Sequence, residues 1–205
     1  MIIGLLALIF ILVIGIYLIQ KWNFNNEASM QELQATYEHE QFLTNNHGEE
    51  VIDAIENYVI KSNSLAAIQD PSILLEIAVP PYTDLFLNSA PEDGKICSDQ
   101  ECLIVESAEV NGIRVLEYTN ERFKAIGCIT FNYDKLSPQG EFIRSLEPLH
   151  TRSIYVFISV EGSWKLAGIF DITIPKDALR DWDYAPDWLR QIIGELPADN
   201  FDCTP

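Results

Sequence analysis

The sequence has few basic residues for its acidity. It carries 13 Lys and Arg against 31 Asp and Glu, which gives a formal net charge of −18 at pH 7. A surface that neutralises phosphates needs the opposite balance, so we exclude nucleic acid as a partner. The chain is nevertheless 48% hydrophobic and 11% aromatic, which is too apolar for a disordered acidic chain. It therefore has a folded core.

Recognisable catalytic motifs are also missing. The sequence contains no His-Glu-x-x-His zinc motif, no glycine-rich phosphate loop and no Gly-x-Ser-x-Gly elbow. It has three histidines, and we interpret His39 and His47 as solvated side chains rather than metal ligands. We therefore predict no catalytic residues, no metal site and no cofactor. Whether the protein is an enzyme stays open at this point, with a non-catalytic role favoured.

The N-terminal segment is the longest apolar run. Residues 2–19 are 18 consecutive uncharged residues, 14 of them Leu, Ile, Val or Phe, and as a helix they rise roughly 27 Å. Tyr17, Lys21 and Trp22 mark the interfacial end. A cleaved signal peptide is the alternative, but a positive n-region and a small-x-small site before Lys21 are both missing. We predict that residues 1–22 are an uncleaved single-pass transmembrane anchor.

Two features point to opposite sides of that membrane. Lys21 is the only side-chain cation near the anchor, and the positive-inside bias then favours a cytoplasmic domain. Cys97 and Cys102, however, bracket a polar four-residue turn and could form a disulfide, which would indicate an oxidising compartment. Two reduced thiols are the other reading of that pair. We predict the cytoplasmic side, with the extracytoplasmic side as the alternative.

Helical patterns follow the anchor. Residues 23–48 are predicted as a polar helical stalk, with an amphipathic helix from Ser29 to Leu43. A helix with one apolar stripe then begins the domain at residue 49. A second helix is predicted to begin at Asp70-Pro71 and to end before Pro80-Pro81. A third, short helix is predicted over 82–87. The apolar stripe consists of Val51, Ile52, Ile55, Tyr58 and Val59.

Beyond residue 100 the apolar residues recur at every second position, as in a β-strand, and no longer at helical spacing. Turns are predicted at Asn111-Gly112, at 119–121 and at 161–163, so several antiparallel strands follow one another. Both faces of the later strands carry apolar residues, which indicates that one face packs on the helices and the other on something else. Helices followed by an antiparallel meander predict an α+β domain over 49–174 with a curved sheet.

The order of these elements, together with the last hairpin, carries a family resemblance. The final strand begins Gly162-Ser163-Trp164-Lys165-Leu166. Over about residues 49–174 the chain resembles the nuclear transport factor-like (SnoaL-like) superfamily, and within it the membrane-anchored, non-catalytic members. The resemblance implies a cone-shaped, cystatin-roll-like fold and transfers no catalytic residues. Many members of that superfamily bind partners or small ligands in the cone.

A ligand pocket in such a cone needs polar groups on the strands. Glu117, Asp134 and Asp171 lie in or beside predicted strands, and Tyr118 or Tyr155 could act as a proton donor. We take Glu117, Tyr118 and Asp171 as the pocket candidates. The alternative is that such carboxylates face solvent or pair with a cation on a neighbouring strand.

The tail, residues 175–205, is acidic and rich in tryptophan. Trp182, Tyr184 and Trp188 are candidate partner-binding residues, because Trp and Tyr dominate interface hot spots. A short helix is predicted over 186–194, and the favoured alternative is that this helix closes the domain's own sheet.

These observations predict a single-pass membrane-anchored binding or assembly protein. Its α+β domain would engage another membrane protein or complex. The alternative is a membrane-tethered enzyme or small-ligand carrier that uses the interior of the cone.

Overall fold

The computed structural model describes residues 2–64, 67, 70–84, 102–137, 139–173 and 181–197, with the backbone alone for 2–28 and 71. The chain divides into two compact units, residues 1–42 and residues 43–205. Cys97, Cys203 and residues 85–87 of the expected helix over 82–87 lie outside the described residues, whereas 82–84 are helical.

The first unit is the N-terminal part of helix α1, which spans Ile2–Ser62. Its described side chains include four exposed large apolar ones, Met30, Leu33, Tyr37 and Phe42. Among the residues whose side chains are described, no helix is long and apolar enough to cross a membrane. The predicted anchor, residues 2–19, lies outside those residues.

The second unit begins with the C-terminal part of α1. Val51, Ile55, Tyr58 and Val59 of the predicted stripe are buried, which confirms the helical pattern there. The Asp70 carboxylate then accepts hydrogen bonds from the Ser72 amide and hydroxyl, at 3.1 and 2.6 Å. This cap begins the 3-10 helix η1 (Pro71–Ile73), which leads into helix α3 (Leu74–Ile77).

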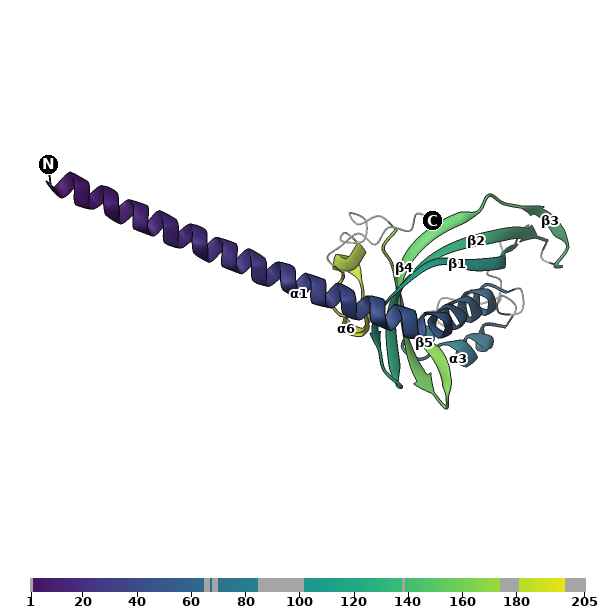
Figure 1. The fold of residues 1–205 in the computed structure, drawn as a ribbon. Helices are drawn as coiled ribbons and strands as arrows, with labels where there is room; N and C mark the ends of the chain where they lie inside the picture. The colour runs from purple at the N-terminus through teal and green to yellow at the C-terminus, as the bar shows by residue number, and fades with distance from the viewer. Residues whose placement is uncertain are drawn as a thin grey trace. The chain divides into compact units, whose positions relative to one another are not determined.

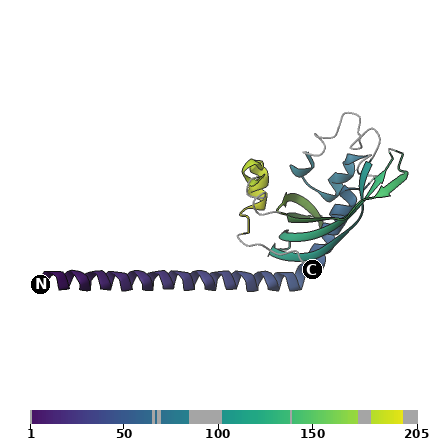
Figure 2. The same cartoon turned by 90° about the horizontal axis from the view of Figure 1, so that it is seen from above.

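An antiparallel sheet of five strands follows the helices. The strands are β1 (Cys102–Tyr118), β2 (Arg122–Leu136), β3 (Phe142–Ser145), β4 (Leu149–Val160) and β5 (Ser163–Asp171). Their order is β1-β2-β4-β5, and β3 pairs with the end of β2. Figure 1 shows the curved strands arching over the C-terminal turns of α1 and over α3, and Figure 2 shows the same domain from above. The predicted α+β class with a curved antiparallel sheet is confirmed.

One predicted turn is wrong. Asn111 and Gly112 lie inside the continuous strand β1, where Val110 pairs with Ile129 and Gly112 pairs with Cys128. Asn111 is thus the extra residue of a β-bulge, and its Oδ1 accepts a hydrogen bond from the Thr130 hydroxyl at 2.5 Å. The strand continues because β2 is long enough to pair with both halves of β1. An Asn-Gly pair marks a bulge here instead of a hairpin.

The other two predicted turns are confirmed. β1 and β2 are joined at Thr119, whose amide donates to the Arg122 carbonyl at 2.8 Å. β4 and β5 are joined at Glu161 and Gly162, which have φ of 54° and 78°. Two consecutive positive φ angles are typical of the tight two-residue turns that match the twist of a hairpin.

The outer edge of β1 donates hydrogen bonds to α1 and to the residue after it. The amide of Val115 donates to Thr44 Oγ1 at 2.9 Å, that of Val110 to Glu56 Oε1 at 3.0 Å, and that of Val105 to the Asn63 carbonyl at 3.2 Å. These three backbone N–H groups are thereby satisfied without another strand.

The sheet has a core on each face. On the first, which we call the α1 face, Phe123, Tyr155 and Phe157 pack against buried residues of α1 and of the segment that contains α3. On the second, the α6 face, Ile126, Ile154 and Val156 pack with the described C-terminal residues. The sequence expectation that one face meets helices and the other something else is confirmed, and the second cover is the C-terminal segment.

Helix α6 (Asp187–Ile193) provides that cover, as predicted for the tail. It approaches the sheet closely at Gly168, where a Cβ atom would lie 3.1 Å from both Leu189 Cδ1 and Ile192 Cγ2. Two cations of β2 hold the end of the helix. The Arg122 guanidinium donates to the Ile192 carbonyl at 2.7 Å, and Lys124 Nζ donates to the Glu195 carbonyl at 2.9 Å.

Candidate functional site

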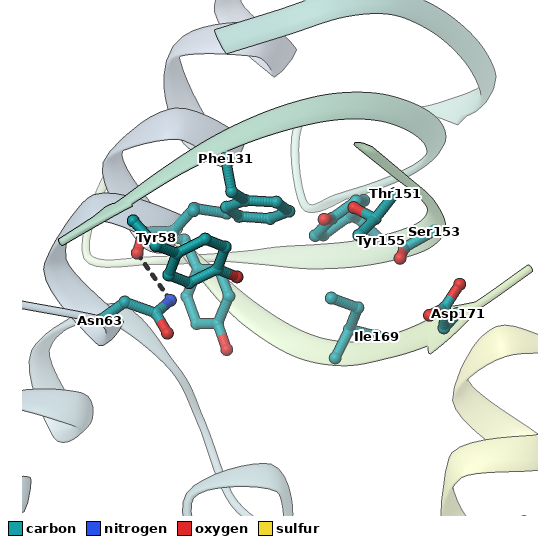
Figure 3. A pocket seen from close by; sticks show the side chains of 10 residues that line it. Tyr58, Asn63, Phe131, Thr151, Ser153, Tyr155, Ile169 and Asp171 are labelled. Atoms are coloured by element: carbon teal, nitrogen blue, oxygen red, sulfur yellow. Dashed lines mark hydrogen bonds between the residues drawn. The ribbon is translucent and has the colours of Figure 1, made fainter. Parts of the chain in front are cut away.

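A pocket of about 300 Å³ lies on the α1 face. Its walls come from the C-terminal turns of α1 and from strands β2, β4 and β5, so residues distant in sequence converge there (Figure 3). The lining residues are Tyr58, Val59, Asn63, Phe131, Tyr133, Thr151, Ser153, Tyr155, Ile169 and Asp171.

The pocket has an aromatic end and a polar end. Tyr58 and Phe131 lie at one end, and Thr151, Ser153 and Asp171 lie at the other (Figure 3). Strand periodicity explains the grouping, because alternate residues of β4 and of β5 point to the same face. The site can therefore hold a ligand that is apolar at one end and hydrogen-bonding at the other.

Several polar atoms of the lining are already engaged with the protein. Tyr58 Oη lies 3.0 Å from Tyr82 Oη in a buried pair. Asn63 Nδ2 donates to the Val59 carbonyl at 2.9 Å and to Ser62 Oγ at 3.0 Å. These bonds use the donors of the Asn63 amide and leave its Oδ1 as an acceptor.

The carboxylate of Asp171 is also partly engaged. Its Oδ1 accepts hydrogen bonds from the Thr173 amide, at 2.8 Å, and from the Thr173 hydroxyl. Both bonds go to one oxygen, so the carboxylate is fixed in orientation while Oδ2 stays available for a further hydrogen bond. Asp171 is exposed, which keeps this acceptor accessible.

The tyrosines of the pocket stay protonated. Burial raises the pKa of Tyr58, of Tyr133 and of Tyr155 above the ordinary value for a phenol. For Tyr155 the Asp171 carboxylate raises the pKa further, and a hydrogen bond with Ser153 opposes the shift. At neutral pH these side chains are neutral hydroxyls and none acts as a phenolate base.

The carboxylate and the serine and threonine hydroxyls of this lining lie together on two strands. The ten residues include no Lys, Arg, His or Cys, and Ser153 of β4 is the cross-strand partner of Asp171 of β5. Across the described residues, no three His, Cys, Asp or Glu side chains come together as metal ligands would. The arrangement can enclose a small group and orient it by hydrogen bonds.

Only one of the three predicted pocket residues lies in this pocket. Asp171 lines it, whereas Glu117 is exposed on β1 and lies 3.8 Å from Arg122 Nε in an ion pair. Glu117 thus follows the alternative of pairing with a cation on the next strand. Asp134 is buried but adjoins Tyr133, and neighbouring strand residues point to opposite faces.

Tyr118 belongs to a separate cluster around Glu50 of α1. Tyr118 Oη donates to Glu50 Oε2 at 2.5 Å, and Trp164 Nε1 donates to Glu50 Oε1 at 2.6 Å. The His47 ring stacks on Tyr118 with centroids 3.6 Å apart. The hydrogen bond from Tyr118, then that from Trp164, lowers the pKa of Glu50, and burial with this carboxylate raises the pKa of Tyr118 to about 12. The cluster ties α1 to β1 and β5.

The three aromatic residues of the tail differ in their contacts. Trp182 packs edge-on against Phe170, with ring centroids 4.9 Å apart, and Trp188 packs edge-on against Tyr82 at 6.4 Å. Tyr184 is 84% exposed. Two of the three candidate partner residues therefore contact the domain itself, as the alternative for the tail predicted.

Two cysteines of the sheet form disulfides. Cys102 of β1 and Cys128 of β2 are both disulfide-bonded. They are not bonded to each other, because their positions in the ladder are eight residues apart along β2, roughly 26 Å. Their partners lie outside the described residues, where the sequence has Cys97 and Cys203. The predicted pairing of Cys97 with Cys102 stays a prediction, and Cys128 is both bonded and buried in the core.

Sequence reasoning missed most of the pocket. Tyr58 was assigned to the helix core, and Asn63, Phe131 and Tyr133 carried no distinctive motif. The available signal was the alternation of tyrosine and hydroxyl residues in β4, at Thr151, Ser153 and Tyr155, on a face otherwise apolar.

A scan of the sequence against models of protein families finds no match, and neither does a search of curated proteins.

Proposed function

We propose that this chain is a single-pass membrane-anchored binding protein that acts through the pocket on the α1 face. The carrying observation is the composition of that pocket, which joins aromatic walls at Tyr58 and Phe131 to hydrogen-bonding groups at Asp171 and Ser153. Residues 2–19 serve as the anchor in this proposal, because their length and apolarity suit a bilayer. The enzyme alternative has no comparable support.

Filling the pocket tests this proposal. Ile169 is a partly buried lining residue, so Ile169→Phe adds volume inside the cavity. Ile143→Phe makes the same change at an exposed position of β3. A small-molecule library screened by ligand-observed NMR against the full chain in detergent should give binders that Ile169→Phe loses and Ile143→Phe keeps. Binders that both variants retain, or no binder at all, would contradict the pocket as the site.

The proposed location of the domain is the extracytoplasmic side. Lys21 gives a weak bias toward the cytoplasm, but the bonded Cys102 and Cys128 are typical of oxidising compartments. A disulfide persists only where thiols are not continuously reduced, so two bonded cysteines outweigh a single flanking cation.

Thiol labelling of intact cells decides between the two sides. With an impermeant reductant and an impermeant maleimide, an extracytoplasmic domain is labelled only after reduction. A cytoplasmic domain is labelled in neither case until the membrane is permeabilised. Labelling that appears only after permeabilisation would reverse the proposed orientation.

We propose the cone fold of the nuclear transport factor-like superfamily for this domain. The proposal is supported by the order of elements, with helices before the strands, and by the curvature of the antiparallel sheet.

A second candidate function is assembly with another membrane protein. It is favoured by four exposed apolar side chains at one end of the sheet. At that end Leu103 of β1 pairs with Lys135 of β2, and β3 pairs with Lys135 and Leu136. Those side chains are Leu103, Phe142, Ile143 and Leu149. Chemical cross-linking before detergent extraction should recover a second protein with the wild type, and less with Phe142→Ser and Ile143→Ser together. Recovery of the free monomer alone would count against assembly.

A further inference from the structure

Among the described residues that line the pocket, the charge is negative. Asp171 is the only carboxylate of these ten residues, and none of them has a basic side chain. The tyrosines stay neutral because burial raises the pKa of each. The chain as a whole carries −18, so the surrounding field also attracts cations and repels anions. An anionic ligand is disfavoured at this site.

The lining offers two acceptor oxygens beside hydroxyls, which can either donate or accept. Both Asn63 donor bonds go to the protein, which leaves Oδ1, and the Asp171 carboxylate keeps Oδ2. Tyr58 is already paired with Tyr82. Asn63 lies beside Tyr58 and Asp171 lies at the other end, so an N–H donor group at the polar end meets the Asp171 carboxylate (Figure 3).

The walls that face this polar end are aromatic. Phe131 and Tyr133 lie with ring centroids 5.8 Å apart, and Tyr58 and Tyr155 add two further rings to the lining. Ring faces attract a cation and also bury an alkyl chain. A carboxylate at one end and rings at the other therefore suit an organic cation with an alkyl chain better than a metal ion.

The volume limits the ligand to a small one. A cavity of about 300 Å³ is at the lower end of small-molecule sites. From these contacts we infer that the pocket binds a primary ammonium group carried on a short alkyl chain, with the ammonium at Asp171 and the chain against Tyr58 and Phe131. This inference rests on the proposed binding function and adds the class of ligand. A free alkylamine and the side chain of a lysine share this chemistry.

Three probes of similar shape test the charge requirement on the full chain in detergent. They are pentylammonium, 1-pentanol and pentanoate, titrated by ligand-observed NMR. The Ile169→Phe variant serves as the blank for partition into micelles, since it lacks the pocket volume. Pentylammonium should bind at least about tenfold more tightly than pentanol, pentanoate should not bind, and added salt should weaken only the ammonium.

A charge-removing variant locates the ammonium. Asp171→Asn keeps the size of the side chain and an oxygen that accepts from Thr173, so the fold is maintained. It should reduce the affinity for pentylammonium by about tenfold or more and leave pentanol unchanged. Glu109→Gln removes an exposed carboxylate outside the pocket and should leave both affinities unchanged.

The outcomes separate this inference from the proposed function. Equal binding of pentylammonium and pentanol, abolished by Ile169→Phe, would overturn the inference that the ligand is an ammonium and would leave the proposed binding pocket intact. Binding of no probe to the wild type would also overturn the ammonium inference. A library without binders would overturn the proposed pocket itself. Nα-acetyl-lysine methylamide distinguishes the two sources of the ammonium group, a lysine side chain and a free alkylamine. Tighter binding than pentylammonium indicates a lysine side chain, and weaker binding indicates a free amine.

Discussion

The two faces of the sheet are built from the same strands but have different roles. Even and odd residues of β2 divide between them, so Phe123 and Phe131 belong to the α1 face and Ile126 to the α6 face. The α1 face is rich in aromatic rings and holds buried hydroxyls, of which Tyr58 and Tyr82 satisfy each other. The α6 face is largely aliphatic and is closed by a seven-residue helix.

This difference shows where a binding site can exist. Polar groups can be buried only with partners, so a face that retains tyrosines and serines must arrange them around a network or a ligand. An aliphatic face can close completely by packing, and Gly168 lets α6 approach without a gap. The α1 face thus combines core and site, whereas the α6 face is a cover.

The largest effect is expected for a core truncation on the α1 face. Phe157 is 1% exposed and stacks on Phe123 with centroids 4.9 Å apart. Phe157→Ala should lower the free energy of unfolding by about 3–5 kcal/mol, because a cavity remains where the ring was. Denaturant unfolding of the full chain in detergent measures this. Phe142→Ala, at an exposed ring on β3, should stay within about 0.5 kcal/mol, and equal effects would contradict the assignment of the core.

The next effect tests whether helix α6, whose Trp188 packs against the α1-face core, belongs to the domain itself. Trp188 is half-buried and contacts Tyr82, so Trp188→Ala should cost about 2–3 kcal/mol, less than a fully buried tryptophan. Tyr184→Ala removes an exposed ring of the same tail and should leave the melting temperature unchanged. An unchanged melting temperature for Trp188→Ala would instead make that side chain a partner-docking residue.

A third variant separates the two faces. Gly168→Val places methyl groups against Leu189 and Ile192, which already lie 3.1 Å from a Cβ position, and should destabilise by about 1–3 kcal/mol. Since the clash is on the α6 face, the affinity for pentylammonium should be unaffected when it is measured at a temperature at which the variant is folded. Gly168→Ala, which adds less volume, serves as the milder control. Loss of binding with retained folding would show that the faces are coupled.

The smallest effect concerns the Glu50 cluster at the margin of the α1 face. Its carboxylate has a lowered pKa in the folded protein, so its contribution to stability is present above about pH 4.3, the ordinary value, and is lost as the pH falls through the folded pKa. Glu50→Gln should flatten the acid side of the curve of melting temperature against pH in that window. Glu49→Gln, an exposed neighbour on α1, should not. An unchanged acid limb for Glu50→Gln would mean that the hydrogen bonds from Tyr118 and Trp164 add nothing to stability.

The sequence predicted the elements better than their connections. The helical stripe ending at Val59 and the turn at Gly162 follow from local periodicity and turn chemistry, and both are present. The turn expected at Asn111 failed because the partner strand was long enough to pair through it, which is a non-local property. Local chemistry could not distinguish a bulge from a hairpin there.

The pocket was less predictable for a related reason. Asp171 was identified because an acid beside a strand is unusual, whereas Asn63 and Phe131 acquire their roles only when α1 and β2 meet. Glu117 had the same local pattern as Asp171 but is beside Arg122 across the β1–β2 turn. Which of two similar carboxylates faces a cavity depends on strand register and bulges, and these are set by tertiary packing.

The hydrogen bonds along β1 have a consequence for association of this protein with itself. A strand of 17 residues at the border of a sheet is a template onto which a strand of another molecule could add. Here Thr44, Glu56 and the Asn63 carbonyl occupy N–H groups at Val115, Val110 and Val105, and bulges interrupt the straight ladder that an added strand would need. The C-terminal part of α1 therefore also protects the sheet against growth into an intermolecular one, so a chain without this helix would expose an aggregation-prone border even if its five strands still paired.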